Sequence, residues 1–475
     1  MFFSSLKKVI AIFLHSNTYF FKFYQSIKSP LSIGPFLLLL QNKIQIMTFE
    51  NTIEFAKKMD SQDPLQKYQQ EFHFPEVNGK KVIYFTGNSL GLQPKRTKAY
   101  VDEVMNDWAN LAVEGHFYSE KPWWDYHERF AKPLSKIVGA LPSEVTVMNT
   151  LTVNLHLLMV SFYQPTKTRY KIICEEKAFP SDQYMFQSQV DFHSRSIGFR
   201  PDEALVEIKR REGEHNIRLE DVLAKIKEVG NELALVLIGG VNYYTGQVFD
   251  MKTITAAGHE AGAYVGWDLA HAAGNVKLNL HDWNVDFASW CSYKYMNSGP
   301  GNASGCFIHE KHHNNAQLPR FAGWWGHNKE RRFKMEQTFD PVHGADGWQI
   351  SNLPILSLAP YLASVEMFDE IGMDYLIQKR NAITSYLEFI LHEIDKEVES
   401  TFEIITPSNQ EERASQLSVL LHGEGRSLFE YLMKNGVITD WREPNVIRLA
   451  PVPLYSSFED MYHFGQILKA GILNK

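Results

Sequence analysis

Two side chains with complementary chemistry follow predicted strands in the middle of the chain. Lys294 lies in a polar turn just after the apolar run 287–291, and Asp268 ends the apolar run 263–268. A lysine beside a buried strand is a candidate for Schiff-base chemistry, because a desolvated amine loses its proton and becomes a nucleophile. Taken singly, either residue would be assigned to the surface, where most lysines and aspartates lie.

Together, the lysine and the acid match the requirements of pyridoxal phosphate (PLP). A lysine carries this cofactor as a Schiff base, and an acid pairs with the pyridinium nitrogen so that the ring can withdraw electrons. Lys294 and Asp268 end two separate predicted strands. Because ligands of open α/β sheets bind beyond the carboxyl ends of the strands, the pair predicts a PLP site at one edge of a sheet.

The elements around this pair alternate between strand and helix. After a strand that feeds the glycine-containing turn at 81–91, we predict strands at 144–149, 170–174, 233–238, 263–268 and 287–291, with helices at 94–111, 153–163 and 253–261. The run 233–238 is wholly apolar, which is typical of a strand buried on both faces of a parallel sheet. The order of elements therefore predicts an α/β fold with a mostly parallel sheet.

The pattern changes at about residue 350, and we expect four segments in all. These are an N-terminal extension (1–46), an N-terminal arm (47–95), a large cofactor-binding domain (96–349) and a small C-terminal domain (350–475). The last segment predicts a smaller α+β domain, because a long helical stretch (354–394) precedes short strands at 417–421 and 446–449.

The first 46 residues differ from the rest, with five lysines and no acidic residue. Their apolar runs are shorter than the ~20 residues that a membrane-spanning helix needs, so we expect no stable membrane association. A targeting peptide and a true translation start at Met47 are both alternatives. We favour a non-native or disordered extension.

Composition narrows the class of protein. A chain of 475 residues with 44% hydrophobic residues is ample for a large core, and its net charge of −7 provides no basic surface for nucleic acid. The three cysteines form no closely spaced pair, which argues against a disulfide scaffold or a zinc site and suits the cytoplasm. We assign His312 and His313, in a polar stretch, to a surface loop and predict no metal site.

Three shorter patterns add detail to the predicted site. Thr150-Leu-Thr152 lies between a strand and a helix, where hydroxyls and free backbone N–H groups bind phosphate. Phe179-Pro-Ser-Asp182 follows the next strand and offers an aromatic face beside a carboxylate. His271 follows Asp268 closely enough to approach a cofactor. Each pattern alone is common in turns and helix caps, so their order along the chain carries the prediction.

This ordered set resembles the kynureninases, fold type I PLP enzymes of the aspartate aminotransferase superfamily. The resemblance extends from about Asp63 to the C-terminus and leaves out residues 1–46. It implies a mostly parallel, seven-stranded large domain, a smaller α+β C-terminal domain and a homodimer with shared active sites. Further segments that carry the resemblance are 84–91, 241–246, 323–327, 350–352 and 447–455.

The resemblance also implies roles for individual residues. Lys294 would carry PLP, Asp268 would pair with its ring nitrogen, and Phe179 would stack on the ring. The other implied cofactor contacts are Leu151, Thr152, Pro180, Ser181, Asp182, His271, Tyr293, Trp324 and Asn352. Arg448 would bind the α-carboxylate of the substrate, for which a guanidinium is well suited. Gly239 departs from family members that carry a hydroxyl residue at this position, and so lacks the side chain for that contact.

The implied reaction is hydrolysis of the Cβ–Cγ bond of L-kynurenine or 3-hydroxy-L-kynurenine to an anthranilate and L-alanine. Lys294 would remove the α-proton, and Tyr293 with a bound water would handle protons at the ketone. His116 and Asn352 would face the aromatic end of the substrate, a combination that resembles members preferring the 3-hydroxy compound. The sequence itself leaves open the ratio of the two substrates and whether the pathway serves tryptophan breakdown or NAD synthesis.

Other functions stay open at this point. Aminotransferases and cysteine desulfurases use the same lysine and acid, although a desulfurase needs a nucleophilic cysteine in its C-terminal part and no cysteine follows Cys306. A PLP-binding regulator without turnover would need a DNA-binding segment, which neither the charge nor the fold supplies. A membrane-attached protein would rest on residues 1–46 alone.

Overall fold

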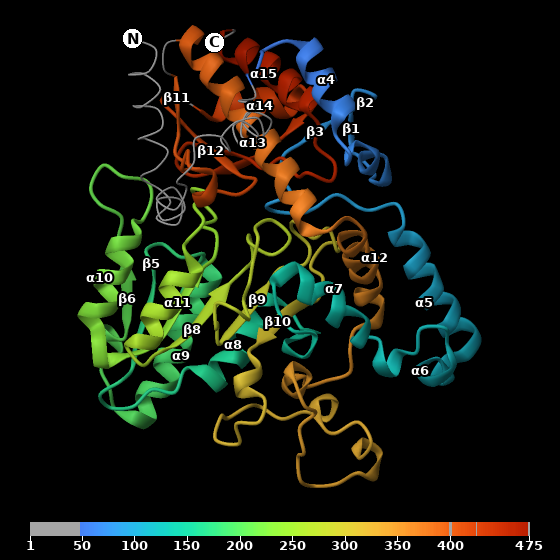
Figure 1. Cartoon of the computed structure of the whole chain (residues 1–475), viewed down its shortest axis with the longest axis vertical. Helices are drawn as coiled ribbons and strands as arrows, with labels where there is room; N and C mark the ends of the chain where they lie inside the picture. The colour runs from blue at the N-terminus through green and yellow to red at the C-terminus, as the bar shows by residue number, and fades with distance from the viewer. Residues whose placement is uncertain (1–47, 399–400, 424, 474–475) are drawn as a thin grey trace, which may run out of the picture. The chain divides into compact units, whose positions relative to one another are not determined.

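The strand that ends at Asp268 and the strand that precedes Lys294 are neighbours in a seven-stranded sheet (Figure 1). The computed structural model describes residues 48–398, 401–423 and 425–473. In spatial order the sheet consists of β4 (Val145–Met148), β10 (Ser304–Ile308), β9 (Phe287–Trp290), β8 (Tyr264–Asp268), β7 (Leu233–Gly239), β5 (Lys171–Glu175) and β6 (Leu205–Ile208). Only β10 runs antiparallel to its neighbours, so the predicted mostly parallel, seven-stranded sheet is confirmed.

Helices cover both faces of this sheet. The helices of the described chain are α4 (Ile53–Gln62), α5 (Thr97–Leu111), α6 (Gly115–Tyr118), α7 (Glu128–Val138), α8 (Leu151–Phe162), α9 (Pro180–Ile197), α10 (Leu219–Val229), α11 (Met251–Glu260), α12 (Ile355–Ile371), α13 (Met373–Val398), α14 (Arg426–Lys434) and α15 (Phe458–Leu473). Helices α8 and α9 share one core with the sheet, whereas α7, α10, α11 and α12 share the other.

Strand β7 shows why its sequence is apolar at successive positions. Its Leu235 and Leu237 pack into the core with α8 and α9, and Val236 and Ile238 pack into the opposite core. Side chains of a strand alternate between faces, so a strand covered on both sides needs apolar residues at every position. This arrangement places the middle of the sheet in the interior and leaves the strand ends for function.

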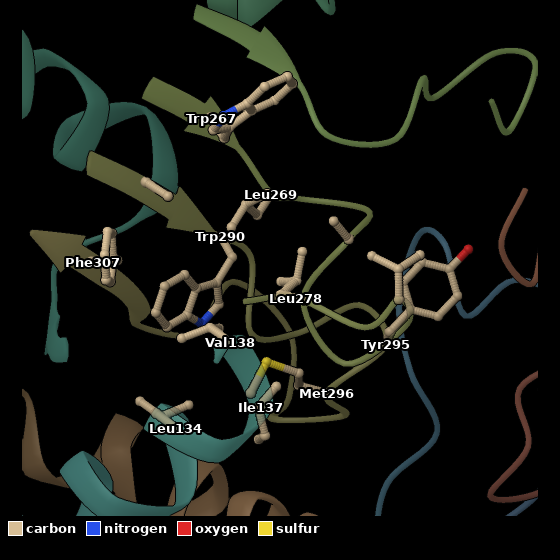
Figure 2. Packing of buried hydrophobic residues seen from close by; sticks show 14 of the residues in the cluster. Leu134, Ile137, Val138, Trp267, Leu269, Leu278, Trp290, Tyr295, Met296 and Phe307 are labelled. Atoms are coloured by element: carbon tan, nitrogen blue, oxygen red, sulfur yellow. The ribbon is translucent and has the colours of Figure 1, made fainter. Parts of the chain in front are cut away.

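Trp290, at the end of β9, is the centre of the larger core. Figure 2 shows its indole beside Leu134, Ile137 and Val138 of α7, with Phe307 of β10 on the neighbouring strand. The indole N–H is not left without a partner, because it donates to the hydroxyl of Tyr361 at 2.9 Å. This packing fixes the strand that leads directly into the turn of Lys294.

A second, four-stranded sheet lies in the C-terminal part of the chain. Its order is β11 (Phe402–Ile404), β12 (Leu417–Leu421), β15 (Val446–Leu449) and β14 (Asp440–Arg442), and all three pairings are antiparallel. In Figure 1 its strands β11 and β12 lie near the orange and red helices α13 to α15. The predicted strands at 417–421 and 446–449 are confirmed with identical bounds.

The N-terminal arm joins this part of the molecule. Short strands β1 (Glu76–Val77) and β2 (Lys80–Lys81) pair with each other, and β3 (Ile83–Tyr84) pairs in parallel with β13 (Val437–Ile438). Residues 51–475 form one compact unit, and the division into arm, large and small domains stays a prediction. The predicted extension 1–46 lies outside the described residues. No helix in the described part of the chain is long and apolar enough to cross a bilayer.

The assignment of His312 and His313 to a surface loop is wrong. Both side chains are buried. The Nε2 of His312 lies 2.8 Å from Asp286 Oδ1, and the Nε2 of His313 lies 2.9 Å from the carbonyl oxygen of Ile308. A carboxylate 26 residues earlier in the chain thus makes the burial of a polar stretch possible.

Candidate active site

A cavity of about 500 Å³ lies at the carboxyl ends of the parallel strands. The predicted site residues among its lining are Leu151, Thr152, Phe179, Ser181, Asp182, Asp268, His271, Tyr293, Lys294 and Arg448. Sequence reasoning missed six further polar side chains that line it: Asn88, Ser89, Glu175, Tyr243, Cys291 and Arg442. The fold therefore collects residues separated by more than 300 positions around one space.

The lysine and the acid lie where two neighbouring strands end. β8 and β9 are parallel with Asp268 opposite Ser289, so the chain that continues from β9 brings Lys294 back towards Asp268. The Nζ of Lys294 lies 3.1 Å from the Nε2 of His271 and 6.0 Å from the centre of the Phe179 ring. Amine, carboxylate and aromatic face are thus grouped around the same cavity.

His271 is poised as a neutral hydrogen-bond acceptor for the lysine. Burial, reinforced by the positive charges of Lys294 and Arg448, holds the pKa of His271 well below its usual range. The ring then has one unprotonated nitrogen, and Nε2 can accept from the Lys294 amine. The opposite nitrogen, Nδ1, is buried without a hydrogen-bond partner in the described structure.

Two further carboxyl groups are buried beside Asp268. Burial raises the pKa of Asp182 well above its usual value, and the nearby Asp268 adds to the effect. Burial also raises the pKa of Glu175 to about 7, against hydrogen bonds from the backbone N–H of Gly239 that lower it. A Cβ atom at Gly239 would lie 3.0 Å from Glu175 Oε1, so the carboxyl of Glu175 occupies the space beside this glycine.

The N-terminus of α8 forms another side of the cavity. Thr150, Leu151 and Thr152 all line it, and no side chain caps this helix. The first backbone N–H groups of a helix lack intrahelical partners and carry partial positive charge, so this end is suited to a phosphate. Pro180 does not line the cavity; it opens α9, where its fixed φ favours the first helical turn.

The turn at 86–91 packs directly against the lysine. The N–H of Gly91 donates to the carbonyl oxygen of Tyr293 at 2.8 Å. A Cβ atom at Gly91 would lie 2.5 Å from the carbonyl oxygen of Lys294, so only glycine permits this approach. The same turn places Asn88 and Ser89 in the cavity wall.

Arg448 comes from the C-terminal sheet and is 1% exposed. Its Nη2 contacts Asp440 Oδ2 at 2.5 Å, and its Nη1 donates to the carbonyl oxygen of Tyr243 at 2.6 Å. The Nε has no hydrogen-bond partner in the described structure. A buried guanidinium with an unused N–H at a cavity wall is suited to bind an anionic group of a ligand.

Besides Pro180, three predicted site residues lie outside the cavity. His116 is half-buried in α6, with its Nδ1 3.0 Å from the carbonyl oxygen of Val113. Trp324 is 40% exposed, and its indole donates to the carbonyl oxygen of Arg332. Asn352 is exposed. The cavity of a single chain thus brings together Arg448 and most of the predicted cofactor contacts, but neither Trp324 nor the residues predicted to face the aromatic ring.

One cluster outside the cavity has the composition of a metal site. Ligand atoms of Glu144, His281 and His309 lie within 4.8 Å of one another. These groups already bond within the protein: Glu144 accepts from backbone N–H groups at 2.8 and 2.9 Å, its Oε1 lies 2.9 Å from His281 Nδ1, and His309 Nδ1 accepts the N–H of Lys311 at 3.2 Å. This bonding gives the cluster a structural role in joining the segments that precede β4 and follow β10.

Comparison with known proteins establishes the family. The kynureninase C-terminal domain model matches residues 376–468. A kynureninase of Flavobacterium johnsoniae is 85% identical over 90% of this chain and 100% of its own length. The chain belongs to the kynureninase family. A kynureninase of Nematostella vectensis is 48% identical over 88% of this chain and 93% of the relative, so the similarity over nearly the whole chain extends to more distant relatives.

Solved structures confirm the fold class. The cysteine desulfurase of Thermococcus onnurineus NA1 superposes with a TM-score of 0.67 over 83% of this chain and 95% of its own, at 17% identity. A cysteine desulfurase of Escherichia coli gives a TM-score of 0.66 over 90% of this chain and 99% of its own, at 12% identity. At such low identity these similarities carry the fold and not the activity.

Proposed function

We propose that the chain is a kynureninase that uses PLP to hydrolyse the Cβ–Cγ bond of L-kynurenine and 3-hydroxy-L-kynurenine. One water is consumed, and the products are an anthranilate and L-alanine. The observation that carries the proposal is the grouping of Lys294, Asp268 and Arg448 around one cavity, in a chain that is 85% identical to a kynureninase over 90% of its length.

The residues present fit PLP. The cavity offers a lysine amine, a buried acid, an aromatic ring and an uncapped helix N-terminus, which match the aldehyde, the ring nitrogen, the ring face and the phosphate. When bound, the cofactor supplies an electron sink for the carbon that loses a proton or a substituent. Phe179, Ser181 and Asp182 would lie beside the ring, and Tyr293, Leu151 and Thr152 near the phosphate.

The protein residues supply binding and proton transfer. Arg448 would hold the α-carboxylate and so orient the substrate amine towards Lys294. Lys294, whose amine donates to neutral His271, would take the proton from the substrate Cα. Burial holds the pKa of Tyr293 above its usual range, so its hydroxyl remains a proton donor at neutral pH and would act with a water at the ketone.

A cysteine desulfurase activity is disfavoured, although the structural neighbours carry that name. All three cysteines, Cys174, Cys291 and Cys306, are buried. Burial also raises the pKa of each thiol, which opposes the thiolate that a nucleophilic cysteine needs. An aminotransferase that received its amino-acid substrate alone would convert the bound cofactor to its amine form and stop there, because the next half-reaction needs a keto acid. An absorbance spectrum recorded after addition of substrate alone therefore distinguishes that reaction.

A homodimer with shared active sites would bring the remaining predicted residues to the cavity. Large apolar side chains around them are exposed, including Phe117 (47%), Phe333 (58%) and Met335 (75%). Phe117 and Phe333 lie 6.4 Å apart and join the two segments into one surface. An apolar surface of this kind is typical of a protein interface, and a second copy would cover it with His116, Trp324 and Asn352 at its edge.

Mixing an inactive variant with one that has reduced activity on 3-hydroxy-L-kynurenine tests the shared site, with that substrate in the assay. A Lys294→Ala chain lacks its own lysine but still carries His116. In a mixed dimer this His116 would complete the site that contains Lys294 of the His116→Ala chain. Refolding the two together should restore activity above the sum of the separate variants if each site uses residues of both copies. A monomer in light scattering would contradict the dimer, and a dimer without complementation would contradict only the sharing of sites.

The reaction itself is tested with both substrates on protein that begins at Met47. Anthranilate fluorescence and alanine release should follow the addition of L-kynurenine or 3-hydroxy-L-kynurenine. A yellow protein without turnover would move the function to another PLP reaction, and a colourless protein that PLP cannot reconstitute would overturn the site. The three unpaired cysteines support a reducing compartment, and we place the enzyme in the cytoplasm.

A further inference from the structure

Arg442 lines the cavity but has no part in the roles described above. It lies on β14 two residues after Asp440, and alternate residues of a strand point to the same face. In the adjacent strand Arg448 is the register partner of Asp440. The carboxylate of Asp440 therefore lies between two arginines, with Oδ2 2.5 Å from Arg448 Nη2 and Oδ1 3.2 Å from Arg442 Nη1.

The charges of this group require a second cation for substrate binding. Arg448 is buried, Asp440 is 10% exposed, and the two already neutralise each other. A substrate carboxylate placed beside that pair would be a buried negative charge without compensation, which is costly. Arg442 adds one positive charge on the same carboxylate, so the group as a whole carries a net positive charge until an anion binds.

The position of Arg442 also allows it to reach a ligand. Its side chain is 36% exposed, whereas that of Arg448 is 1% exposed. A second cavity, of about 1100 Å³, adjoins the first and shares Tyr243 and Arg442 with it. The guanidinium of Arg442 therefore faces both spaces, and it can turn towards a carboxylate without the large desolvation that a fully exposed side chain would suffer.

We propose that Arg442 is a second carboxylate-binding residue, which holds the α-carboxylate of the substrate together with Arg448 across the shared Asp440. Arg448 contributes its unpaired Nε–H from the buried side, and Arg442 contributes the compensating charge from the boundary of the two cavities. The inference rests on the proposed role of Arg448. In this arrangement the carboxylate of Asp440 positions both guanidinium groups.

Binding of L-alanine to the holoenzyme, followed by the absorbance of the cofactor, tests the proposal directly. Arg442→Gln should raise the Kd of L-alanine and the KM of L-kynurenine roughly 10- to 100-fold, the range expected for one lost charge-assisted contact. The kcat should change by less than about threefold, because the lost contact is made equally before and during the reaction. Arg442→Lys, which keeps the charge, should recover most of the affinity.

A matched control and a parallel variant separate the possible outcomes. Arg210 lines only the larger cavity, where it lies near Glu176, and Arg210→Gln should leave both constants within about twofold. An unchanged Kd in Arg442→Gln, or equal losses in Arg442→Gln and Arg442→Lys, would overturn the proposal, because a structural role does not depend on charge. An unchanged Kd in Arg448→Gln would instead overturn the carboxylate site itself.

Discussion

The two ends of strand β9 present opposite uses of buried charge. Before the strand, Asp286 is fully bonded: it accepts from His259 and His312 at 2.8 Å each, from the N–H of Val265 at 2.7 Å, and pairs with Lys311. After the strand, the groups around Lys294 keep unpaired atoms, such as Nδ1 of His271. The first end is complete without a ligand, and the second is not.

The buried carboxyl groups in these two regions have pKa shifts of opposite direction, because hydrogen bonds and charges compensate the burial of one and not of the other. Burial alone would raise the pKa of Asp286, but the hydrogen bonds from His259 and His312 and the charge of Lys311 hold it below its usual range. Around the cavity beyond the other end burial prevails, and the pKa of Glu175, the last residue of β5, rises to about 7. Burial of a carboxyl group is therefore not by itself a sign of function. A buried carboxyl group whose charge is not compensated by partners is a better indication of a functional site.

The largest effect is expected at the reactive end. Lys294→Ala removes the amine that carries the cofactor and moves the substrate proton, and activity should fall by at least about 10³-fold. The cofactor absorbance at visible wavelengths should be lost as well. Lys277→Ala is the matched control, because Lys277 is an exposed lysine that pairs with Asp374. Retention of both activity and absorbance in Lys294→Ala would contradict the central assignment.

At the bonded end, the expected loss is in stability rather than in chemistry. Asp286→Asn removes a charge that two histidines and a lysine share, and should lower the free energy of unfolding by about 3 kcal/mol. Because the folded pKa of Asp286 is lowered, its contribution is present above the unfolded pKa and is lost as the pH falls below about 4.

Denaturant unfolding at pH 7 and pH 3 measures this difference. The stability difference between Asp286→Asn and the wild type should be smaller at pH 3 than at pH 7. The kcat per folded molecule should stay within about twofold of wild type at neutral pH. A loss of kcat without a loss of stability would mean that the two ends of β9 are not separate in function.

The sequence predicted the site residues that lie at the ends of strands, because these residues follow apolar runs directly. Apolar runs and the polar residues after them identify Asp268 and Lys294 without knowledge of their neighbours. Strand β10 is not among the predicted strands, and its residues Ser304 and Gly305 are not typical of an apolar run. Its structure gives the reason: a Cβ atom at Gly305 would lie 2.1 Å from the indole of Trp290, so the glycine makes room for a core residue of the next strand.

Residues that depend on distant partners had no local signal. Glu175 ends an apolar strand, like Asp268, but its importance comes from the space beside Gly239, 64 residues later. Arg442 lies in a strand of three residues whose register with β15 brings it to the same carboxylate as Arg448. His312 was misassigned for the same reason, because its partner Asp286 is remote in the sequence.

A pH experiment on Glu175 measures the uncompensated burial. Its folded pKa of about 7 lies above the ordinary value of 4.5, so its contribution to stability is present below the unfolded pKa and is lost as the pH rises through 7. The wild type should lose up to about 3 kcal/mol more than Glu175→Gln between pH 5 and pH 8. Glu207→Gln is the control, since Glu207 is exposed on the adjacent strand β6. Parallel pH profiles for wild type and Glu175→Gln in thermal unfolding would contradict the raised pKa.

The smallest effect is expected at His116, which belongs to neither end of β9. Its ring packs edge-on against Trp123 at 5.2 Å and lies outside the cavity of its own chain, so its removal should leave the cofactor in place. If His116 contacts the ring hydroxyl of the substrate, His116→Ala should lower kcat/KM for 3-hydroxy-L-kynurenine about tenfold, and that for L-kynurenine much less. His392→Ala, at an exposed position of α13, is the control. Equal losses for the two substrates would mean that His116 supports the site without contacting the ring hydroxyl. Selectivity between the two substrates would then have to come from residues within the cavity itself.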